Sequence, residues 1–178
     1  DNATVLYATT KSDQSTDELP AKAFDGNEST KWCPGGNAYE AQMSIDLGKT
    51  YDIYKCDLTH AGISESQARN TRDFTVDVLK TTPTAEQLAD QAWLTDDANW
   101  ESIVSYTNNQ QSRTSDTFDT PVTGRYFRLN VTNGDSSAQW RSTRIFEWSL
   151  TGYEAQDTPV KPSVPQEVTW TVEGAASA

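Results

Sequence analysis

The stretch QMSIDL, residues 42–47, alternates polar and apolar residues and stops at Gly48. Alternation with a period of two is typical of a β-strand with one buried face. The stretch FTVDVL, residues 74–79, has the same pattern. The remaining expected strands are residues 52–58, 103–106, 126–131 and 145–150. Since no helical pattern alternates with these strands, the sequence predicts an all-β fold, an antiparallel sandwich rather than a parallel α/β sheet.

A short helix is expected inside one loop. Residues 84–93, TAEQLADQAW, follow Pro83 and offer Thr84 as an N-cap with Glu and Gln after it, which are the signals of a helix start. Leu88 and Trp93 are expected to pack onto the sandwich. This helical insert is therefore predicted to be a decoration and not a functional helix.

The charge of the chain excludes several classes of partner. The chain carries 14 basic and 26 acidic residues, a net charge of −12. Such a surface repels phosphate backbones and anionic lipid, so neither nucleic acid nor a bare membrane is expected as a partner. No apolar run approaches the roughly 20 residues that a membrane-inserted helix needs. The same charge attracts divalent cations and tolerates neutral sugars.

The chain is expected to have two parts, a β-sandwich over residues 1–154 and a tail over residues 155–178. Residues 156–165, QDTPVKPSVP, hold three prolines and no core pattern, which is typical of an extended linker. The end of the chain could begin a following module, so we expect a multidomain parent. Cys33 and Cys56, the two cysteines, could pair or could be half-buried small side chains.

One loop gathers the oxygen ligands that a hard cation prefers. Residues 22–32, KAFDGNESTKW, place Asp25, Asn27 and Thr30 around Gly26. A tight loop of this kind can turn several oxygens onto one calcium ion. The same Asp-Gly-Asn sequence is equally an ordinary turn. Glu147 is a candidate for a further ligand, because it interrupts the apolar run IFEWSL, where a buried carboxylate is costly without a partner.

Six segments in this order resemble a known family: AFDGNESTKW, SIDLG, THAG, NTRDFTV, GRYFRLNVT and TRIFEWSLTG. The chain resembles the discoidin-like superfamily, also called coagulation factor V/VIII type C domains, and more closely carbohydrate-binding module family 32. The resemblance runs from about Ala21 to Gly152. It implies a jelly-roll-type, galactose-binding-domain-like β-sandwich, appended to a secreted bacterial glycoside hydrolase. The expected location is extracellular or at the cell surface.

The resemblance also implies a structural Ca²⁺ site. In such modules the ion is held by the first of these stretches together with a glutamate near the last strand. Carried over to this chain, the implied ligands are the Lys22 carbonyl, Asp25, Asn27, Thr30, the Phe146 carbonyl and Glu147.

The expected sugar site lies in the loop HAGISESQARNTR, residues 60–72. The resemblance ranks His60 and Asn70 first, although His60 could be a capping or half-buried histidine and Asn70 a turn residue. Arg72 and Glu65 come next, and they could instead pair with each other or shape the loop. Family members tend to have HAGAGGE where this chain has HAGISES, so the role of Glu65 and the sugar are left open.

An aromatic platform is expected beside these groups, since a sugar has one apolar C–H face that stacks on a ring. Trp140 is favoured because it lies in the polar loop GDSSAQWRST, with Tyr39 as the second choice. Trp32 and Trp148 are assigned to the core.

No catalytic activity is expected. The acidic residues are scattered and offer no evident pair for glycoside hydrolysis, no serine lies in a GxSxG-like elbow, and His and Cys are too few for zinc. The resemblance implies a monomeric, non-catalytic module that binds a terminal mono- or disaccharide, galactose or N-acetylgalactosamine, on host or mucin-type glycans. Alternatives are an adhesion domain that binds protein or lipid, and a structural spacer without a ligand.

Overall fold

The structure is a computed structural model that describes residues 2–135, 141–156, 168–169 and 171–172. The strands are β1 (Asn2–Ala8), β2 (Ala41–His60), β3 (Asp73–Leu79), β4 (Trp100–Tyr106), β5 (Arg113–Asn133), β6 (Ile145–Glu154), β7 (Val168–Thr169) and β8 (Thr171–Val172). The α-helices are α1 (Ala85–Leu88) and α2 (Gln91–Thr95), and 3-10 turns cover Thr16–Glu18, Pro20–Phe24, Ala61–Ile63, Gln67–Arg69 and Asp97–Asn99. The predicted mostly antiparallel β-sandwich with few short helices is confirmed.

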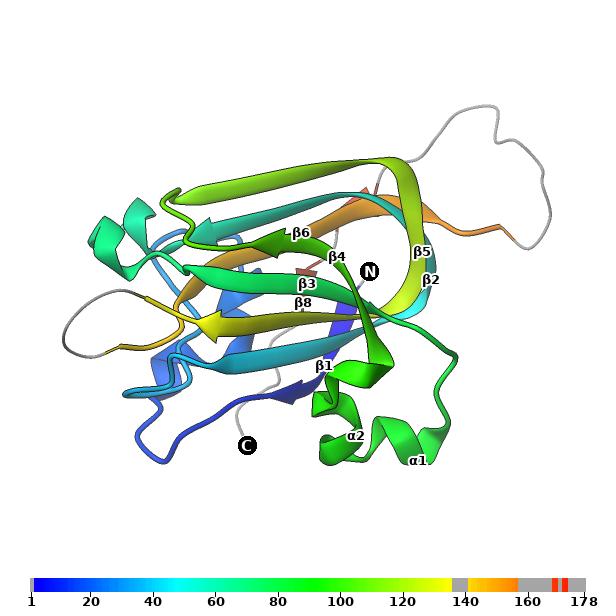
Figure 1. Ribbon diagram of the computed structural model, residues 1–178, viewed down its shortest axis with the longest axis horizontal. Helices are drawn as coiled ribbons and strands as arrows, with labels where there is room; N and C mark the ends of the chain where they lie inside the picture. The colour runs from blue at the N-terminus through cyan, green and yellow to red at the C-terminus, as the bar shows by residue number, and fades with distance from the viewer. Residues whose placement is uncertain (1, 136–140, 157–167, 170, 173–178) are drawn as a thin grey trace.

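Two long strands, β2 and β5, bend and take part in both layers of the sandwich (Figure 1). In β2 the register shifts between Asp46 and Tyr51, around Gly48, whose φ of 82° favours glycine. The sequence suggested two separate strands here, and they are the two halves of β2. Because both halves pair with β5, the glycine bends the strand without reversing it.

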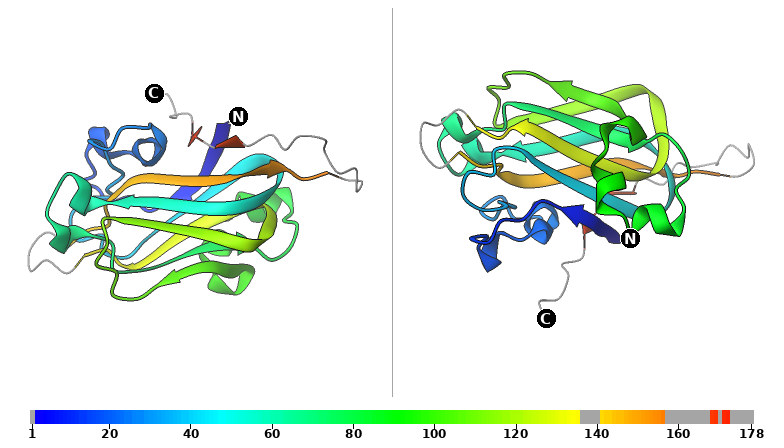
Figure 2. Two further views of the ribbon diagram at one scale, coloured as in Figure 1. Left: turned by 90° about the horizontal axis from the view of Figure 1, so that it is seen from above. Right: turned by 60° about the horizontal axis from the view of Figure 1, so that its bottom comes forward.

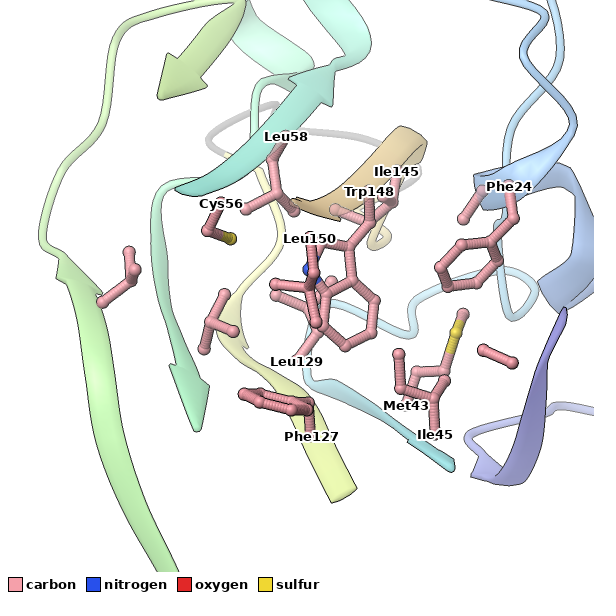
Figure 3. Close-up of a cluster of buried hydrophobic side chains, with 14 of the residues drawn as sticks. Phe24, Met43, Ile45, Cys56, Leu58, Phe127, Leu129, Ile145, Trp148 and Leu150 are labelled. Carbon is pink, nitrogen blue, oxygen red and sulfur yellow. The ribbon is translucent and has the colours of Figure 1, made fainter. Parts of the chain in front are cut away.

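The strands form two layers. One layer has the order β4-β3-β5-β2-β1, and the other is formed by the remaining halves of β5 and β2 together with β6 (Figure 2). Alternate side chains of these strands point inward and form the core. Figure 3 shows part of it, with Trp148 and Leu150 of β6 packed against Met43 and Leu129. Trp32 and Trp148 are fully buried, so their assignment to the core is confirmed.

The helical insert covers the outer face of the β4-β3-β5-β2-β1 layer (Figure 2, right). Thr84 forms the predicted N-cap, in a capping box with Gln87. The buried apolar anchor is Leu94, whereas Leu88 and Trp93 are only partly buried. The carbonyl of Leu94 accepts a hydrogen bond of 2.8 Å from the Trp100 indole, which fixes the insert to the start of β4.

The described parts of the tail pair with the sandwich itself. Strand β7 pairs with β6 and strand β8 pairs with β1, each over two residues. Both partners offer backbone groups at a sheet edge, which is why a short extended segment can add there. Strand β6 ends at Glu154, and the expected division of the chain at residue 154 stays a prediction. The expected following module stays a prediction.

Cys33 and Cys56 are free thiols, and both are buried. Burial raises the pKa of the Cys56 thiol, which keeps it neutral. Cys33 lies 3.2 Å from the Ser142 hydroxyl at one end of the sandwich. Of the two alternatives left open by the sequence, the structure contains the unpaired one. Within the described residues, no helix is long and apolar enough to cross a membrane.

Candidate functional site

The loop end of the sandwich, at the left of Figure 1, brings together segments that are far apart in sequence. These segments are residues 31–39, 61–72 and 133–144, of which 136–140 lie outside the described part. They meet here because β2 both begins and ends at this end and β5 runs back to it. We call the charged cluster formed by Lys31, Glu65, Arg69, Asp135 and Arg144 the loop-end network.

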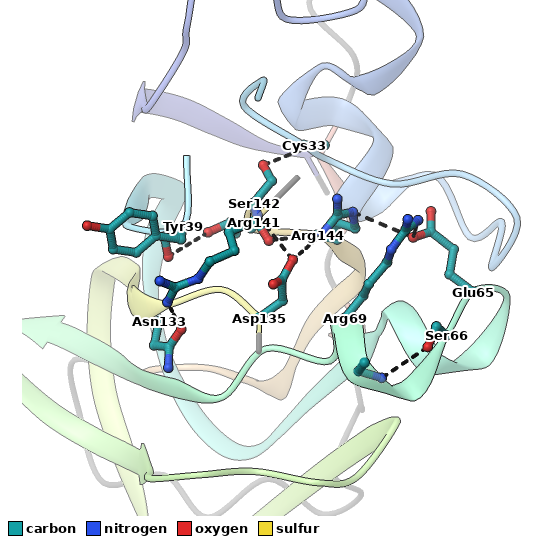
Figure 4. Close-up of polar contacts among 12 residues, drawn as sticks. Cys33, Tyr39, Glu65, Ser66, Arg69, Asn133, Asp135, Arg141, Ser142 and Arg144 are labelled. Carbon is teal, nitrogen blue, oxygen red and sulfur yellow. Dashed lines mark hydrogen bonds and ion pairs between the residues drawn. The ribbon is translucent and has the colours of Figure 1, made fainter. Parts of the chain in front are cut away.

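Glu65 is the hub of the loop-end network (Figure 4). Its carboxylate lies 2.5 Å from Lys31 Nζ, 3.1 Å from Arg69 Nη1 and 3.5 Å from Arg144 Nε. Burial opposes ionisation of Glu65, but the contacts with Lys31, Arg69 and Arg144 together outweigh it and lower the pKa of this carboxyl. Glu65 is therefore an anion whose orientation is fixed by three cations.

Arg144 contacts both Glu65 and Asp135 and so joins the two carboxylates of the loop-end network. Its Nη1 donates a hydrogen bond of 2.5 Å to the buried carboxylate of Asp135, which also accepts from the Ser142 backbone at 3.1 Å. Charge-assisted bonds of this kind hold a planar guanidinium in one orientation. The network is thus a rigid array of planar polar groups.

A pocket of about 300 Å³ opens beside this array. Its lining residues are Asp13, Glu18, Lys31, Cys33, Gly35, Gly36, Arg69, Ser142 and Arg144. Guanidinium and ammonium groups can donate to sugar hydroxyls, and carboxylates can accept from them. The lining holds three cations and two carboxylates, and the cations are also paired with Glu65 and Asp135 beside the pocket. Because these cations are already paired, the chemistry suits a neutral polar ligand.

Tyr39, one of the two predicted platforms, is exposed at this end of the fold. It is 38% exposed, and the Arg141 guanidinium lies 4.5 Å from the centre of its ring. The Asn133 side-chain oxygen accepts a hydrogen bond from Arg141, which helps to orient the pair. Trp140, the favoured platform, lies outside the described residues and stays a prediction.

His60, Asn70 and Arg72 lie beneath the loop surface, where sequence reasoning had placed them against the sugar. His60 and Asn70 have no exposed area, and Arg72 is 8% exposed. His60 contacts Thr114 through Nε2 at 3.0 Å, and Arg72 donates to the Asn109 carbonyl at 3.2 Å. In this arrangement the three side chains support the loops, and their contact with a sugar stays a prediction.

Asn70 has a clear positioning role. Its Oδ1 accepts a bond of 2.6 Å from the Gly62 backbone, and its Nδ2 lies 3.3 Å from the Gln110 carbonyl and 3.4 Å from the Ser112 hydroxyl. These contacts tie both ends of the loop that carries Glu65 to the neighbouring residues 110–112. A change at Asn70 would therefore move Glu65 without touching a ligand.

Sequence reasoning missed Lys31, Arg69, Asp135 and Arg144 as site residues. Lys31 and Arg144 lie within the matched segments AFDGNESTKW and TRIFEWSLTG, where they read as ordinary strand-flanking charges. Arg69 could have been found, because it lies four residues after Glu65 and forms an i,i+4 ion pair with it.

The residues implied as calcium ligands converge at the junction of the first loops with β6. The backbone N–H of Asn27 donates to both Asp25 and Glu147, at 3.0 Å in each case. The Thr30 hydroxyl lies 2.6 Å from the other oxygen of Asp25. Gly26 has a φ of 69°, which lets the loop turn at this point. Lys22 and Phe146 flank the same junction in sequence.

Burial and the adjacent Asp25 carboxyl raise the pKa of Glu147 to about 7. Two neighbouring carboxylates in a partly buried loop are a destabilising arrangement that a bound cation relieves. The described residues contain no cluster of three or more His, Cys, Asp or Glu that could hold a metal. With two carboxylates and neutral oxygens, the donor set fits a hard cation such as Ca²⁺ and not a transition metal.

Comparisons with known proteins agree with this architecture. A family model described as a NedA-like, galactose-binding domain matches residues 22–129, more than half of the chain. A sequence search among curated proteins finds no match.

Three solved structures share the fold. The family 32 carbohydrate-binding module of Streptococcus pneumoniae EndoD is 24% identical, with a TM-score of 0.64 over 86% of this chain and 96% of that one. The family 32 module of Clostridium perfringens NanJ, in complex with galactose, is 14% identical, with a TM-score of 0.60 over 83% and 92% of the chains. A C. perfringens CBM32 domain in complex with GalNAc-β-1,3-galactose is 16% identical, with a TM-score of 0.59 over 84% and 94%. The chain therefore belongs to the NedA-like, galactose-binding domain family of the discoidin-like, F5/F8 type C superfamily.

Proposed function

We propose that this chain is a non-catalytic carbohydrate-binding module whose loop end binds a terminal galactose or N-acetylgalactosamine. The observation that carries the proposal is the loop-end pocket, where Glu65 holds the lining cations Lys31 and Arg69 in a fixed arrangement. Asp13 and Glu18 add carboxylates to the same lining. Such an array can engage neighbouring hydroxyls as donor and acceptor at once. Membership in a galactose-binding domain family supports the same ligand class.

The preference for a galacto-configured sugar is argued from stereochemistry. The axial 4-hydroxyl leaves a continuous C–H patch on one face of the ring, which stacks on an aromatic side chain. Tyr39 with Arg141 behind it offers such a ring, and Trp140 is the other predicted platform. Two fold neighbours from C. perfringens are described as complexes with galactose and with GalNAc-β-1,3-galactose, which supports this choice.

The biological setting is part of the proposal. We infer that the module is extracellular or cell-surface, is monomeric, and directs an attached bacterial glycoside hydrolase to host or mucin-type glycans. We also infer a structural Ca²⁺ at Asp25 and Glu147, about 120 residues apart in sequence, where it would stabilise the fold without contacting the sugar. The prolines of residues 156–165 support a linker to a further domain.

Calorimetry with galactose, N-acetylgalactosamine, N-acetylglucosamine and fucose tests the ligand and the site. We expect binding of the two galacto sugars, and loss of detectable binding in Glu65→Gln, Arg69→Ala and Tyr39→Ala. Each change removes a hydroxyl partner, the carboxylate that orients the lining cations, or the stacking ring, and we expect a cost of about 1 to 3 kcal/mol of a weak interaction. Trp140→Ala is expected to act in the same way.

Arg125→Ala is the matched control for Arg69→Ala. Arg125 is also an exposed, ion-paired arginine, held by Asp46 at 2.7 Å and stacked on Tyr126, but it lies outside the loop-end network. It should bind like wild type. A preference for N-acetylglucosamine would refute the stereochemical argument, and normal binding by the Glu65 and Arg69 variants would refute the site. Absence of any sugar binding would favour an adhesion domain or a spacer.

A further inference from the structure

A second polar groove lies on the outer face of the β4-β3-β5-β2-β1 layer, between the helical insert and β1. Its volume is about 270 Å³. We call it the sheet-face groove and define it by Tyr7, Glu40, Gln42, Thr95, Asp97 and Asn130. None of these residues belongs to the loop-end network or to the implied calcium ligands.

An irregularity in β1 gives the groove its aromatic wall. Val5 is opposite Ile45 and Tyr7 is opposite Ser44, so β1 carries one extra residue between these pairs. A bulge of this kind changes the face to which the following side chain points. Ile45 and Met43 point into the core, whereas Gln42 lines the groove, and Tyr7 joins Gln42 on that outer side. The bulge therefore adds a partly exposed phenol ring to an otherwise polar surface.

Two side-chain amides form the floor of the groove. Gln42 and Asn130 are direct cross-strand partners in the β2–β5 ladder. Gln42 Oε1 accepts a bond of 3.3 Å from Arg128 Nη1, so its Nε2 is held as a donor on the other side of the amide. The Asn130 amide makes no hydrogen bond with any described residue. The Gln42 side chain thus offers one oriented N–H donor, and the Asn130 side chain offers both its N–H donors and its carbonyl acceptor.

Acceptors flank these amides. Asp97 Oδ1 is bound to Arg128 Nη1 at 2.8 Å, while the Asp97 side chain is 75% exposed and retains its second oxygen for a ligand. The exposed Glu40 carboxylate has no partner among the described residues. Among the described residues no lysine or arginine lines the groove, and Arg128 lies beneath it, held by the buried Asp77 at 2.7 Å. A carboxylated or sulfated ligand would therefore be repelled.

We propose that the sheet-face groove binds a neutral oligosaccharide and is a second glycan site, separate from the loop end. A ring for the C–H face of a sugar, two amides and two carboxylates supply what polyhydroxylated ligands require. Of the described residues that line the groove, only Tyr7, Ala41 and Val131 are apolar, so an apolar peptide anchor finds little matching surface. The site does not depend on binding at the loop end.

Titration of the ¹⁵N-labelled full chain with lacto-N-tetraose, triacetylchitotriose and cellotetraose tests the proposal by NMR. We expect at least one of the three to shift the side-chain amide signals of Gln42 and Asn130. Asn130→Ala should weaken that binding about tenfold, the effect of one lost hydrogen bond. Tyr7→Ala should abolish it, and Tyr7→Phe, which keeps the ring and the packing, should retain most of it.

Two controls separate this site from the loop end. Tyr153→Ala removes a partly exposed tyrosine that stacks on Tyr54 outside the groove, and should leave the shifts unchanged. Galactose-induced shifts at Glu65 and Arg69 should be the same in wild type and Asn130→Ala, so failure of one site is distinguishable from failure of the other. The proposal is overturned if none of the three oligosaccharides shifts Gln42 or Asn130, or if the shifts survive both Asn130→Ala and Tyr7→Ala.

Discussion

His60 and Asn70 show how a polar side chain in a binding loop can act from below the surface. His60 is the last residue of β2, and Asn70 lies three residues before β3. A polar residue at either position is expected both in a side chain that faces a ligand and in one that supports the loop, so the sequence does not separate the two roles. Asn70 satisfies three neighbours at once, whereas His60 packs on Phe74 with ring centres 5.2 Å apart. In the structure both side chains support the loop that carries Glu65, and their contact with a sugar stays a prediction.

His60 should make stability depend on pH. Burial lowers the pKa of folded His60 to about 4. In the unfolded chain the same side chain takes up its proton near pH 6.5. Between these values the unfolded state binds more protons, so His60 reduces stability as the pH falls from about 6.5 to 4, by up to about 1.4 kcal/mol per unit. Urea unfolding across this window should show the loss.

His60→Gln is the comparison, because glutamine can still reach Thr114 but does not titrate. The variant should be less stable than wild type at neutral pH, and the difference should shrink as the pH falls towards 4. Comparing the two proteins at each pH removes the contribution of the other carboxyls. Parallel stability curves for the two proteins would show that His60 titrates normally in the folded state.

At the scale of elements, the loop before β2 and the strand β6 depend on each other. Asn27 in the loop donates its backbone N–H to Glu147 in β6, and Trp32 exchanges backbone hydrogen bonds of 2.8 and 3.0 Å with Ile145. Glu147 and Ile145 are therefore two points at which the first loop is attached to β6. The electrostatic cost of placing it beside Asp25 is what a cation would remove.

Calcium is expected to stabilise the fold, because a ligand that binds only the folded state shifts unfolding by mass action. Adding a chelator should lower the melting temperature of wild type, and Asp25→Ala should be insensitive to both calcium and chelator. Asp57→Ala is the matched control, since among the described residues Asp57 pairs with Lys55 alone, at 3.3 Å, and it is not an implied ligand. Differential scanning calorimetry that finds no effect of chelator on wild type would refute the calcium assignment.

Elements with strict alternation were predictable from the sequence, and elements defined by long-range pairing were not. The patterns at residues 42–47 and 74–79 identify parts of β2 and β3 correctly. The first half of β5 was missed, because its residues are mostly exposed and threonine-rich, with no apolar alternation. Strand β1 was missed because its bulge breaks the period of two.

The sequence located the loop that carries Glu65 but not the charged side chains that Glu65 contacts. The loop at residues 60–72 does lie at one end of the sandwich, and Glu65 and Tyr39 do have exposed surface there. The partners come from loops up to about 110 residues apart. Only the folded arrangement shows that Lys31 and Arg144 both contact Glu65, and that Arg144 also contacts Asp135. Ion pairs across such distances leave no periodic signal in a sequence.

At the scale of the whole molecule, the size of the binding surface limits the affinity. A pocket of about 300 Å³ is at the small end of ligand sites and accommodates little more than a terminal sugar. A small hydrophilic ligand has few atoms to desolvate, and its hydroxyls must give up water. The net charge of −12 adds nothing to the attraction of a neutral ligand.

We therefore expect a single copy of the chain to bind a galacto-configured monosaccharide with a dissociation constant of about 0.1 to 1 mM, or about −4 to −5.5 kcal/mol. Joining two copies by a flexible linker should leave affinity for the free monosaccharide unchanged, because each site is occupied independently. On a surface dense in terminal galactose, the second binding event becomes intramolecular, and apparent affinity should rise by about 10² or more. Surface plasmon resonance on such a surface, with a Glu65→Gln tandem as control, measures the gain. Nanomolar binding of the monosaccharide by one copy, or no gain in the tandem, would show that affinity is not limited by the small site.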